Sequence, residues 1–353
     1  MLPVMSSRTH VLLTRPTFES ALAAEAADRW TDARCVGTEP GLVVFTAPGA
    51  PPAAPLAFER QRIPDARFLE ASRLKPVAPA IAAEIMGAVN DSGRLWSSHA
   101  YTSDPEAGEA LASRAAGVEA AVLREGAKLA REAAKRQRPH EKLARRADGG
   151  LITQFCLTPA GLWHGTAELR DLSSARPGGL HRMAFDPRAP SRSYLKMEEA
   201  LERMGVEPAE GEQVVDLGAA PGGWTFAFLK RGCDVTSVDN GPMKIGELES
   251  LPGRLTHLRE DGVAFAPRGL RTPVDWLVAD MLIPPGVAMG LLRRWLGQGW
   301  ARRFVVNVKI PQDECWQPLK PLHDLLSTLP VKASIRQLYH DRREVTVFGA
   351  AAD

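Results

Sequence analysis

The stretch that decides the fold runs Val214-Val-Asp-Leu-Gly-Ala-Ala-Pro-Gly-Gly-Trp224. A short β-prone run leads into a glycine-rich turn, and a helix-compatible stretch, 224–231, follows it. A nucleotide-like ligand needs close approach to the backbone at such a turn, and only small residues leave that room beside the helix N-terminus. The small residues here are Gly218, Ala220, Gly222 and Gly223. The sequence therefore predicts a nucleotide-binding crevice at the end of this strand.

Two ligands compete for this crevice. The spacing Gly218-x-Ala220-x-x-Gly223 nearly matches the dinucleotide pattern, and Asp239 follows at about the distance of an acid that holds ribose hydroxyls. Three features favour S-adenosylmethionine: the Asp-x-Gly-x-x-Pro-Gly-Gly turn, Asp261 after the third expected strand and Asp280 after the fourth. All lie at the carboxyl ends of expected strands, around one crevice. The predicted cofactor contacts are Asp216, Gly218, Ala220, Pro221, Gly222, Gly223, Trp224, Asp239, Asp261 and Asp280.

The second half of the chain alternates β-prone and helix-compatible segments. Its expected parallel strands are Gln213–Leu217, Asp234–Val238, Leu255–Leu258, Trp276–Ala279 and Phe304–Val308. Such alternation predicts an α/β, Rossmann-like fold with a doubly wound parallel sheet. Two further β-rich runs, Ala333–Tyr339 and Glu344–Gly349, are joined by a polar link and predict a terminal antiparallel hairpin.

The first half is typical of smaller α+β units. Expected strands at Val11–Leu13 and Gly41–Ala47 flank an Ala-rich helix at Phe18–Trp30, and a hairpin is expected over 151–169. Further helices are expected at Ala78–Val89 and Glu106–Ala134. Three prolines between Ser173 and Pro190 predict an irregular linker. The predicted domains are 1–75, 76–172 and 191–353, with 173–190 as the linker.

Composition narrows the function classes. The chain has 353 residues, of which 44% are hydrophobic, so at least two globular cores are expected and a disordered protein is excluded. No apolar run approaches a membrane span, and the N-terminus lacks the residue order of a secretory signal, so we expect a cytoplasmic protein without a membrane partner. The four cysteines show neither CxxC nor mixed His/Cys spacing, which predicts reduced thiols and no metal site.

Charge is nearly balanced, at +2 from 44 basic and 42 acidic residues, so nucleic-acid binding must be judged from its distribution. Between Arg124 and Arg146, nine Lys and Arg residues stand against three Glu. Such a stripe either follows phosphates or is a solvated helix face, and the segment by itself leaves both interpretations open.

Several stretches of the second half resemble one known family. They are Ala189–Lys196, Asp216–Trp224, Ser237–Met243, Arg259–Gly262 and Gln337–Val347. This pattern is similar to the bacterial RlmM family, which methylates a cytidine 2′-oxygen in large-subunit ribosomal RNA. The resemblance is dense over the C-terminal half and thin before it, around Leu12–Pro16 and the 151–169 hairpin.

The resemblance implies a domain organisation and a cofactor. It implies a class I methyltransferase domain over 191–353 that binds S-adenosylmethionine. It also implies an N-terminal RNA-binding region, which is somewhat short in this chain, with a ferredoxin-like subdomain over 1–75 and a THUMP-like part over 76–172.

The family, like the wider group of FtsJ-type ribose methyltransferases, also implies a catalytic Lys-Asp-Lys-Glu tetrad. Its counterparts here are Lys196, Asp280, Lys309 and Glu344. Lys196 lies one turn into a helix that Ser193 is expected to cap, and the resemblance adds Ser193 as a cofactor contact. Asp280 and Lys309 end neighbouring expected strands and Glu344 begins the last one, so we expect folding to bring all four to one rim.

Ribose methylation requires an alcohol to attack a sulfonium methyl group in line, so the hydroxyl proton must be removed. We expect Lys309 to be the base. The ordinary pKa of lysine is about 10.4, so burial and a second cation, Lys196, are expected to lower it. Asp280 and Glu344 oppose that shift and are expected to orient the lysines and the hydroxyl. Taken singly, each of the four is equally typical of surface ion pairs or strand ends.

The predicted function is 2′-O-methylation of a cytidine in 23S ribosomal RNA, or in a large-subunit precursor, by a monomer or weak oligomer. Two alternatives are a base-modifying RNA methyltransferase and a non-catalytic RNA-binding protein that keeps the fold. The first is disfavoured because carbon-5 chemistry uses a cysteine nucleophile and amino-group chemistry commonly uses an Asn/Asp-Pro-Pro-aromatic loop, whereas Asp280 precedes Met-Leu-Ile-Pro-Pro285. Trp224 and Tyr339 either stack on a base or cofactor ring or pack in the core.

Overall fold

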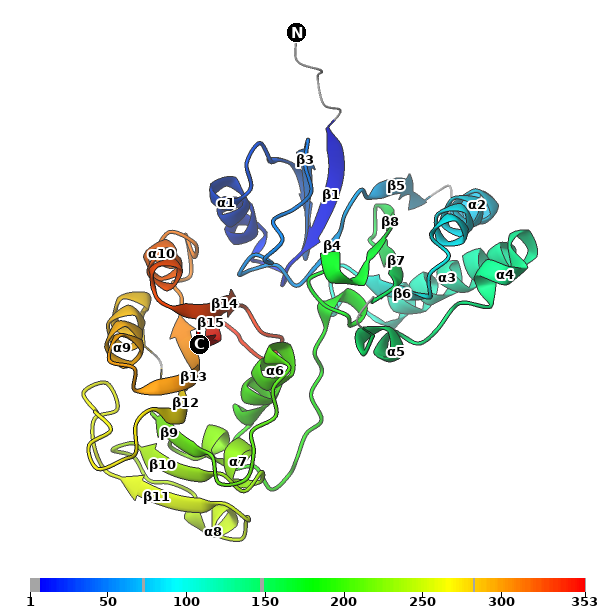
Figure 1. The fold of residues 1–353 in the computed structure, drawn as a ribbon. Helices are drawn as coiled ribbons and strands as arrows, with labels where there is room; N and C mark the ends of the chain where they lie inside the picture. Colours follow the sequence, from blue (N-terminus) through cyan, green and yellow to red (C-terminus); the bar gives the residue numbers. More distant parts are fainter. Residues whose placement is uncertain (1–6, 72–73, 147–148, 282, 353) are drawn as a thin grey trace. The chain divides into compact units, whose positions relative to one another are not determined.

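The chain folds into two compact units, Met1–Leu180 and His181–Asp353. Their structure is a computed structural model, which describes residues 7–71, 74–146, 149–281 and 283–352. Within these ranges no helix has both the length and the apolar character to cross a membrane. The first unit is α+β and the second is α/β, as the sequence predicts (Figure 1). The finer four-part division of the chain stays a prediction.

The first unit begins with a four-stranded antiparallel sheet in the order β2-β3-β1-β4. Its elements are β1 (Arg8–Leu13), α1 (Glu19–Arg29), β2 (Arg34–Glu39), β3 (Leu42–Ala47) and β4 (Gln61–Ile63). This is the strand order of a ferredoxin-like unit, with the loop 48–60 in place of the second helix. Strand β2 was not predicted, because its residues are largely exposed and show no apolar run.

A second four-stranded sheet completes this unit in the order β5-β8-β7-β6. Its elements are β5 (Arg67–Glu70), α2 (Leu74–Ser92), β6 (Trp96–Thr102), α3 (Glu109–Leu129), α4 (Arg131–Ala134), α5 (His140–Ala144), β7 (Leu151–Leu157) and β8 (Gly161–Glu168). Two short turns of 3₁₀-helix follow, η2 (Leu169–Asp171) and η3 (Pro177–Gly179). The β7–β8 hairpin confirms its prediction. The single helix expected over 106–134 is wrong: Ala130 leaves helical geometry (φ −143°, ψ 76°) and separates α3 from α4.

The second unit is built on a seven-stranded sheet in the order β11-β10-β9-β12-β13-β15-β14. Its strands are β9 (Gln213–Leu217), β10 (Asp234–Val238), β11 (Arg254–Leu258), β12 (Val274–Ala279), β13 (Ala301–Lys309), β14 (Val331–Arg336) and β15 (Glu344–Ala351). The first five pair in parallel, and β15 runs antiparallel to both of its neighbours. The predicted parallel sheet and terminal hairpin are therefore confirmed.

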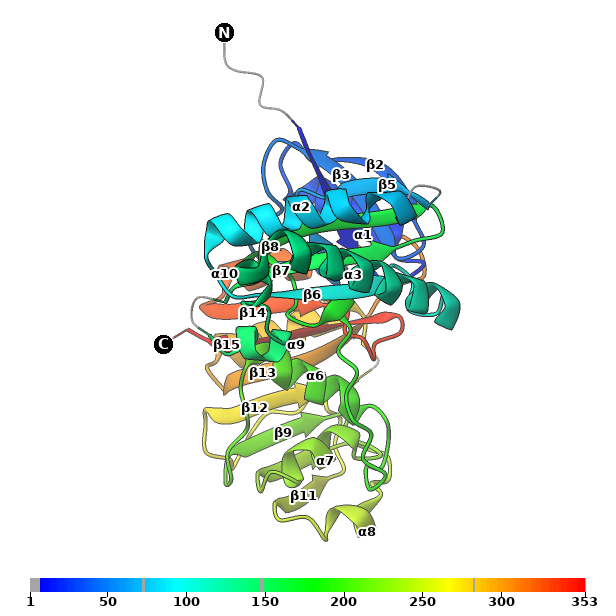
Figure 2. The ribbon, with the colours of Figure 1, turned by 90° about the vertical axis from the view of Figure 1, so that its right-hand side faces the viewer.

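Helices cover both faces of this sheet. They are α6 (Tyr194–Met204), α7 (Gly223–Leu229), α8 (Ile245–Leu248), α9 (Pro285–Gly297) and α10 (Lys320–Thr328). Figures 1 and 2 show α6 and α7 on one face and α9 and α10 on the other. Side chains of one sheet face, Val214, Val278, Val305 and Phe348 among them, form one buried cluster with α6 and α7.

The alternation of side chains along the strands fixes what lies at the rim of this face. Successive residues point to opposite faces, so Asp280 continues the face of Val278, and Asn307 and Lys309 continue the face of Val305. Cross-strand partners share a face as well, and Glu344 lies opposite Lys309 in the β13–β15 register. The fold thus places these polar residues on the α6 side of the sheet, at the carboxyl ends of β12 and β13.

In the first unit, one buried acid holds the loop that replaces the second helix. The side chain of Glu25 on α1 accepts the backbone N–H groups of Ala57 (2.7 Å) and Phe58 (3.1 Å) and pairs with Arg29 (2.6 Å). Burial raises the pKa of Glu25 above its ordinary value, although these three partners oppose the shift. The contacts of the Glu25 carboxylate therefore offset part of the cost of removing it from water.

We expect Glu25→Ala to lower the free energy of unfolding by about 3 kcal/mol, because three donors lose a buried acceptor. Glu25→Gln keeps an acceptor oxygen and should lose less. The matched control is Glu109→Gln, which changes an exposed acid in the first turn of α3 and should stay within about 0.5 kcal/mol of wild type. Urea unfolding followed by circular dichroism measures all three, and equal losses for Glu25→Ala and the control would contradict this account.

Candidate active site

The glycine-rich turn lies between β9 and α7, at the carboxyl edge of the sheet. Gly218 and Gly222 have φ values of +72° and +114°, where residues with a Cβ atom are strained. A Cβ atom on Gly218 would lie 2.3 Å from Met281 Cγ, and one on Gly223 would lie 2.3 Å from the hydroxyls of Ser191 and Ser193. The turn is therefore built with no room for larger side chains, as the sequence predicts.

Two acids stiffen the loops beside this turn. The carboxylate of Asp239, directly after β10, accepts the N–H groups of Ala220 (3.0 Å) and Gly241 (2.6 Å). After β11, Asp261 accepts the N–H of Val263 (2.8 Å). The ends of β9, β10 and β11 therefore form one connected edge around the turn, in the positions expected for the adenosine part of a ligand.

Asp216, the one acid in the sequence Val214–Trp224, is fully buried. One carboxylate oxygen accepts the Thr225 hydroxyl (2.7 Å), and the other has no hydrogen-bond partner among the described residues. Burial raises the pKa of Asp216 to about 7, and the negative charges of Asp280 and Asp239 add to that shift. An orphaned carboxylate oxygen close to two further acids is suited to a cationic ligand.

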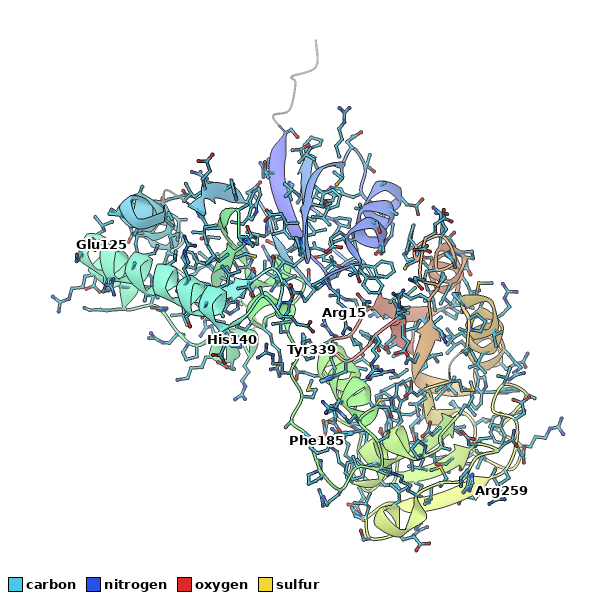
Figure 3. The ribbon with its side chains drawn as sticks, turned by 180° about the vertical axis from the view of Figure 1, so that it is seen from behind. Arg15, Glu125, His140, Phe185, Arg259 and Tyr339 are labelled. Carbon is cyan, nitrogen blue, oxygen red and sulfur yellow. The ribbon has the colours of Figure 1, made fainter. Side chains whose placement is uncertain are left out.

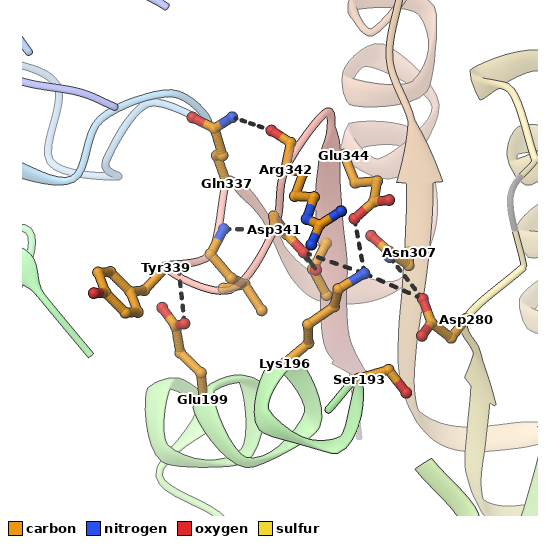
Figure 4. A network of polar contacts seen from close by, with 12 residues as sticks. Ser193, Lys196, Glu199, Asp280, Asn307, Gln337, Tyr339, Asp341, Arg342 and Glu344 are labelled. Carbon is orange, nitrogen blue, oxygen red and sulfur yellow. Dashed lines mark hydrogen bonds and ion pairs between the residues drawn. The ribbon is translucent and has the colours of Figure 1, made fainter. Parts of the chain in front are cut away.

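Lys196 lies at the centre of a network of acids. Its Nζ atom is 2.7 Å from Glu344 Oε2, 3.4 Å from Asp280 Oδ1 and 4.0 Å from Asp341 Oδ1 (Figure 4). Only 12% of its side chain is exposed. Burial by itself lowers the pKa of Lys196, but the three carboxylates outweigh burial and raise it above the ordinary value. Lys196 is therefore a fixed cation.

The pKa values of two carboxylates in this network, Asp280 and Glu344, shift in opposite directions. Burial raises the pKa of Asp280, and its bonds to Lys196 and Asn307 only partly offset this. Burial also acts on Glu344, but there the hydrogen bond and charge of Lys196 prevail and lower its pKa below the ordinary value. Glu344 is thus the closer and stronger partner of the lysine.

The second lysine of the expected tetrad is placed differently. Lys309 ends β13, is exposed, and lies opposite Glu344 in the strand register. Within the described part of the chain, its side chain makes no hydrogen bond or ion pair. The structure thus brings Lys196, Asp280 and Glu344 into contact and leaves Lys309 on the same sheet face with an uncommitted ammonium group.

Two members of the network were not predicted from the sequence. Asn307 Nδ2 donates to Asp280 Oδ1 (2.7 Å), and a hydrogen bond from the same amide helps to lower the pKa of Glu344. Asp341, in the loop before β15, accepts the N–H of Leu338 (2.8 Å). Asn307 and Lys309 are two residues apart on one strand and therefore share a sheet face, so this spacing could have predicted that Asn307 belongs to the network. Nothing in the polar run before Glu344 distinguishes Asp341.

Ser193 does not cap α6 as expected. It occupies the N-cap position but has helical angles (φ −61°, ψ −26°), and its side chain makes no capping bond. Its hydroxyl lies 2.8 Å from the Ser191 hydroxyl instead, beside the glycine turn. The ring of Trp224 is buried in the core and donates to the Ser193 carbonyl (3.0 Å), so its indole is a packing side chain.

The strand order and the glycine turn define the second unit as a Rossmann-like domain of the class I methyltransferase type. Comparison with known proteins agrees: residues 189–289 match the family of FtsJ-like methyltransferases. Among the described residues, no group of three or more His, Cys, Asp or Glu side chains is placed to hold a metal ion.

Curated relatives carry a more particular name. The chain is 45% identical over 188 residues to ribosomal RNA large subunit methyltransferase M of Azotobacter vinelandii, covering 50% of this chain and 52% of that protein. It is 43% identical over 175 residues to the protein of the same name from Halorhodospira halophila, covering 49% and 50%. The Pseudomonas putida protein of that name is 38% identical over 221 residues, covering 58% and 61%. The chain therefore spans about half the length of the curated relatives it matches.

The buried Asp216 generates a pH-dependent prediction. Its carboxyl stays protonated in the folded protein up to about pH 7, whereas the unfolded chain ionises near pH 4, so its contribution to stability is full below pH 4 and falls as the pH rises to 7. Asp216→Asn should remove this component. We expect the difference in unfolding free energy, wild type minus Asp216→Asn, to decrease between pH 4 and 7 in urea titrations.

A second variant checks the cause of that shift. The Thr225 hydroxyl lowers the pKa of Asp216 by donating to it, so in Thr225→Val the decrease should still begin near pH 4 but extend to higher pH. A difference between wild type and Asp216→Asn that does not vary with pH would contradict the buried, protonated carboxyl.

Proposed function

We propose that this protein transfers a methyl group from S-adenosylmethionine to the 2′-oxygen of a cytidine in 23S ribosomal RNA, in the cytoplasm. The observation that carries the proposal is the joint presence of the glycine turn and the Lys196–Asp280–Glu344 cluster on one face of one sheet edge. Similarity to the relatives named ribosomal RNA large subunit methyltransferase M supports the same substrate class.

The residues around the glycine turn suit S-adenosylmethionine. Gly218, Gly222 and Gly223 would hold it close to the backbone, and Asp239 and Asp261 lie where ribose and adenine contacts are expected. The orphaned oxygen of Asp216 suits its positive end. The cofactor supplies an electrophilic methyl group on a sulfonium centre. Pro221 lies within the turn, and Ser193 lies at its edge.

The two lysines would then take different parts in the reaction. Lys196 is held charged by three acids, so it cannot accept a proton, and it would fix Asp280 and Glu344 at the rim. Lys309 has an uncommitted side chain on the same face and is the group left to take the proton of the ribose hydroxyl. Bound RNA would exclude water around this side chain.

The first unit offers a basic surface for the RNA. In the stripe 124–146, Lys128 and Lys135 form ion pairs with Glu125 and Glu132, which matches the solvated-helix interpretation for those two. Five other basic side chains of α4, α5 and their flanks are exposed: Arg131, Arg138, Lys142, Arg145 and Arg146. Figure 3 labels Glu125 and His140 within this stripe. We propose that the exposed cations contact phosphates, in a region of THUMP type.

Base modification is a poorer fit to this site. Carbon-5 chemistry needs a reactive thiolate, but the cysteines of the second unit, Cys233 and Cys315, are buried, and burial raises the pKa of both thiols. The loop after Asp280 holds no aromatic residue among its described positions before Pro285. The oligomeric state, a monomer or weak oligomer, stays a prediction.

Removing the proposed base should stop the reaction and leave the site intact. We expect Lys309→Met to lower kcat by about 100-fold or more, while the Kd for S-adenosylmethionine and the melting temperature stay at wild-type values. The control Lys332→Met replaces an exposed lysine of β14 on the same sheet. Methyl transfer to unmodified 23S RNA and calorimetric cofactor titration measure these effects, and wild-type kcat in Lys309→Met would exclude it as the base.

A cation beside the site should contribute to RNA binding. Arg342 is exposed, and a hydrogen bond from its backbone helps to lower the pKa of Glu344. We expect Arg342→Ala to raise the KM for RNA and to reduce the slope of log K against log salt by about 1, as the loss of one phosphate contact does. Arg254→Ala, at a side chain that is 88% exposed on β11, is the control. Equal KM values for Arg342→Ala and wild type would contradict the contact.

A further inference from the structure

The network around Lys196 contains one acid that lies outside the expected tetrad. Asp341 is fully buried in the loop between β14 and β15. Its carboxylate accepts the Leu338 N–H (2.8 Å) and the Thr346 hydroxyl (3.1 Å), and it lies 4.0 Å from Lys196 Nζ. The acid thus joins a loop, a strand and the lysine of α6.

The geometry points to a simple reason for a third acid. The position of an ammonium group depends on all the anions that face it, including those beyond hydrogen-bond distance. Glu344, at the start of β15, and Asp280, after β12, accept hydrogen bonds from Lys196 Nζ, whereas Asp341, in the loop, lies at the ion-pair distance of 4.0 Å. One carboxylate already balances the charge of the ammonium, so the additional acids act on where Lys196 Nζ is held.

We propose that Asp341 is a positioning residue of the methyl-transfer reaction, which holds the Lys196 ammonium charged and oriented so that Asp280 and Glu344 keep their places beside the acceptor hydroxyl. This inference rests on the proposed function. It assigns Asp341 no contact with substrate or cofactor, because the residue is completely buried.

The cost of burial argues against a merely structural role. Burial raises the pKa of Asp341 well above its ordinary value, and Glu199 and Glu344 add to that shift, while Lys196 and the Leu338 N–H oppose it. A buried carboxylate under these conditions destabilises the fold relative to a neutral side chain of the same shape. An asparagine would keep an acceptor for Leu338 N–H and a donor for the Thr346 hydroxyl. What an asparagine at this position would lack is the ion pair with Lys196 at 4.0 Å.

The same loop supplies a matched control. Glu199 on α6 is equally buried and accepts the N–H of Tyr339 (2.8 Å), the residue after Leu338. Its ion pair is with Arg203 (2.9 Å), and burial raises its pKa as well. Figure 4 shows Glu199 and Asp341 holding neighbouring parts of the loop, with only Asp341 joined to Lys196 by a dashed line. Asp341→Asn and Glu199→Gln therefore remove the same kind of charge from the same loop.

The first test compares the kinetics of these two variants in the full chain. Asp341→Asn should lower kcat for methyl transfer on the order of tenfold to a hundredfold, with unchanged KM for RNA, unchanged cofactor Kd and a melting temperature no lower than wild type. Glu199→Gln should lower the melting temperature, because Arg203 loses its partner, and keep the wild-type kcat.

The pH profile of kcat distinguishes a positioning role of Asp341 from a merely structural one. The charged groups that face Asp341 are Lys196 and Glu199 from α6 and Glu344 from β15, and Asp280 from β12 also faces Lys196. Removing one anion lowers the pKa of Lys196, so the alkaline limb of kcat should move to lower pH in Asp341→Asn and stay in place in Glu199→Gln. Wild-type kcat and pH profile in Asp341→Asn, or a lower melting temperature with an unmoved limb, would overturn the proposal.

A labelling experiment that needs no methyl transfer keeps this test separate from the proposed function. Acetic anhydride reacts only with neutral amines, so mass spectrometry of Lys196, referenced to the exposed Lys332, reports how firmly Lys196 holds its proton. Labelling of Lys196 should rise at least about fivefold in Asp341→Asn and not in Glu199→Gln. Unchanged labelling of Lys196 in Asp341→Asn would overturn the proposal. If labelling rises as expected but the wild-type protein transfers no methyl group, the proposed function is wrong, and the role of Asp341 in that reaction is wrong with it.

Discussion

The site depends on one buried cation. Lys196 needs anions around it, and they come from the ends of β12 and β15 and from the loop before β15. These segments meet at one rim because β15 inserts antiparallel between β13 and β14. A buried charge needs partners around it, and the strand order brings the partners of Lys196 together. The amide of Asn307 completes the arrangement by bonding to Asp280.

This arrangement gives the two lysines of the expected tetrad different surroundings. Lys196 is committed to three acids, and its pKa is raised, so its proton stays in place. Lys309 lies across the strand register from Glu344 and makes no ion pair within the described residues. A reaction that removes a proton from an alcohol needs one free amine and a rigid frame around it. We propose that Lys309 and Lys196 meet those two requirements separately.

The fold could be predicted largely from the sequence, because strand–helix alternation and the glycine turn are local patterns. The strands at Gln213–Leu217 and Asp234–Val238 have the predicted bounds. Strand β2 and the break at Ala130 were missed, since exposure and a single non-helical residue leave no periodic signal. In the site, the contacts of Lys196, Asp280 and Glu344 follow from strand ends meeting at one edge. Asp341 could not be found, because its importance arises only when the loop folds over α6.

The most direct measurement is transfer of a labelled methyl group from S-adenosylmethionine to 23S ribosomal RNA that lacks its modifications, followed by nuclease digestion to nucleosides. The account predicts that the label appears as 2′-O-methylcytidine, because the site offers an amine base and a frame of acids but no reactive thiolate. A label on a nucleobase would contradict it, and so would the absence of label from an enzyme that binds both the cofactor and the RNA.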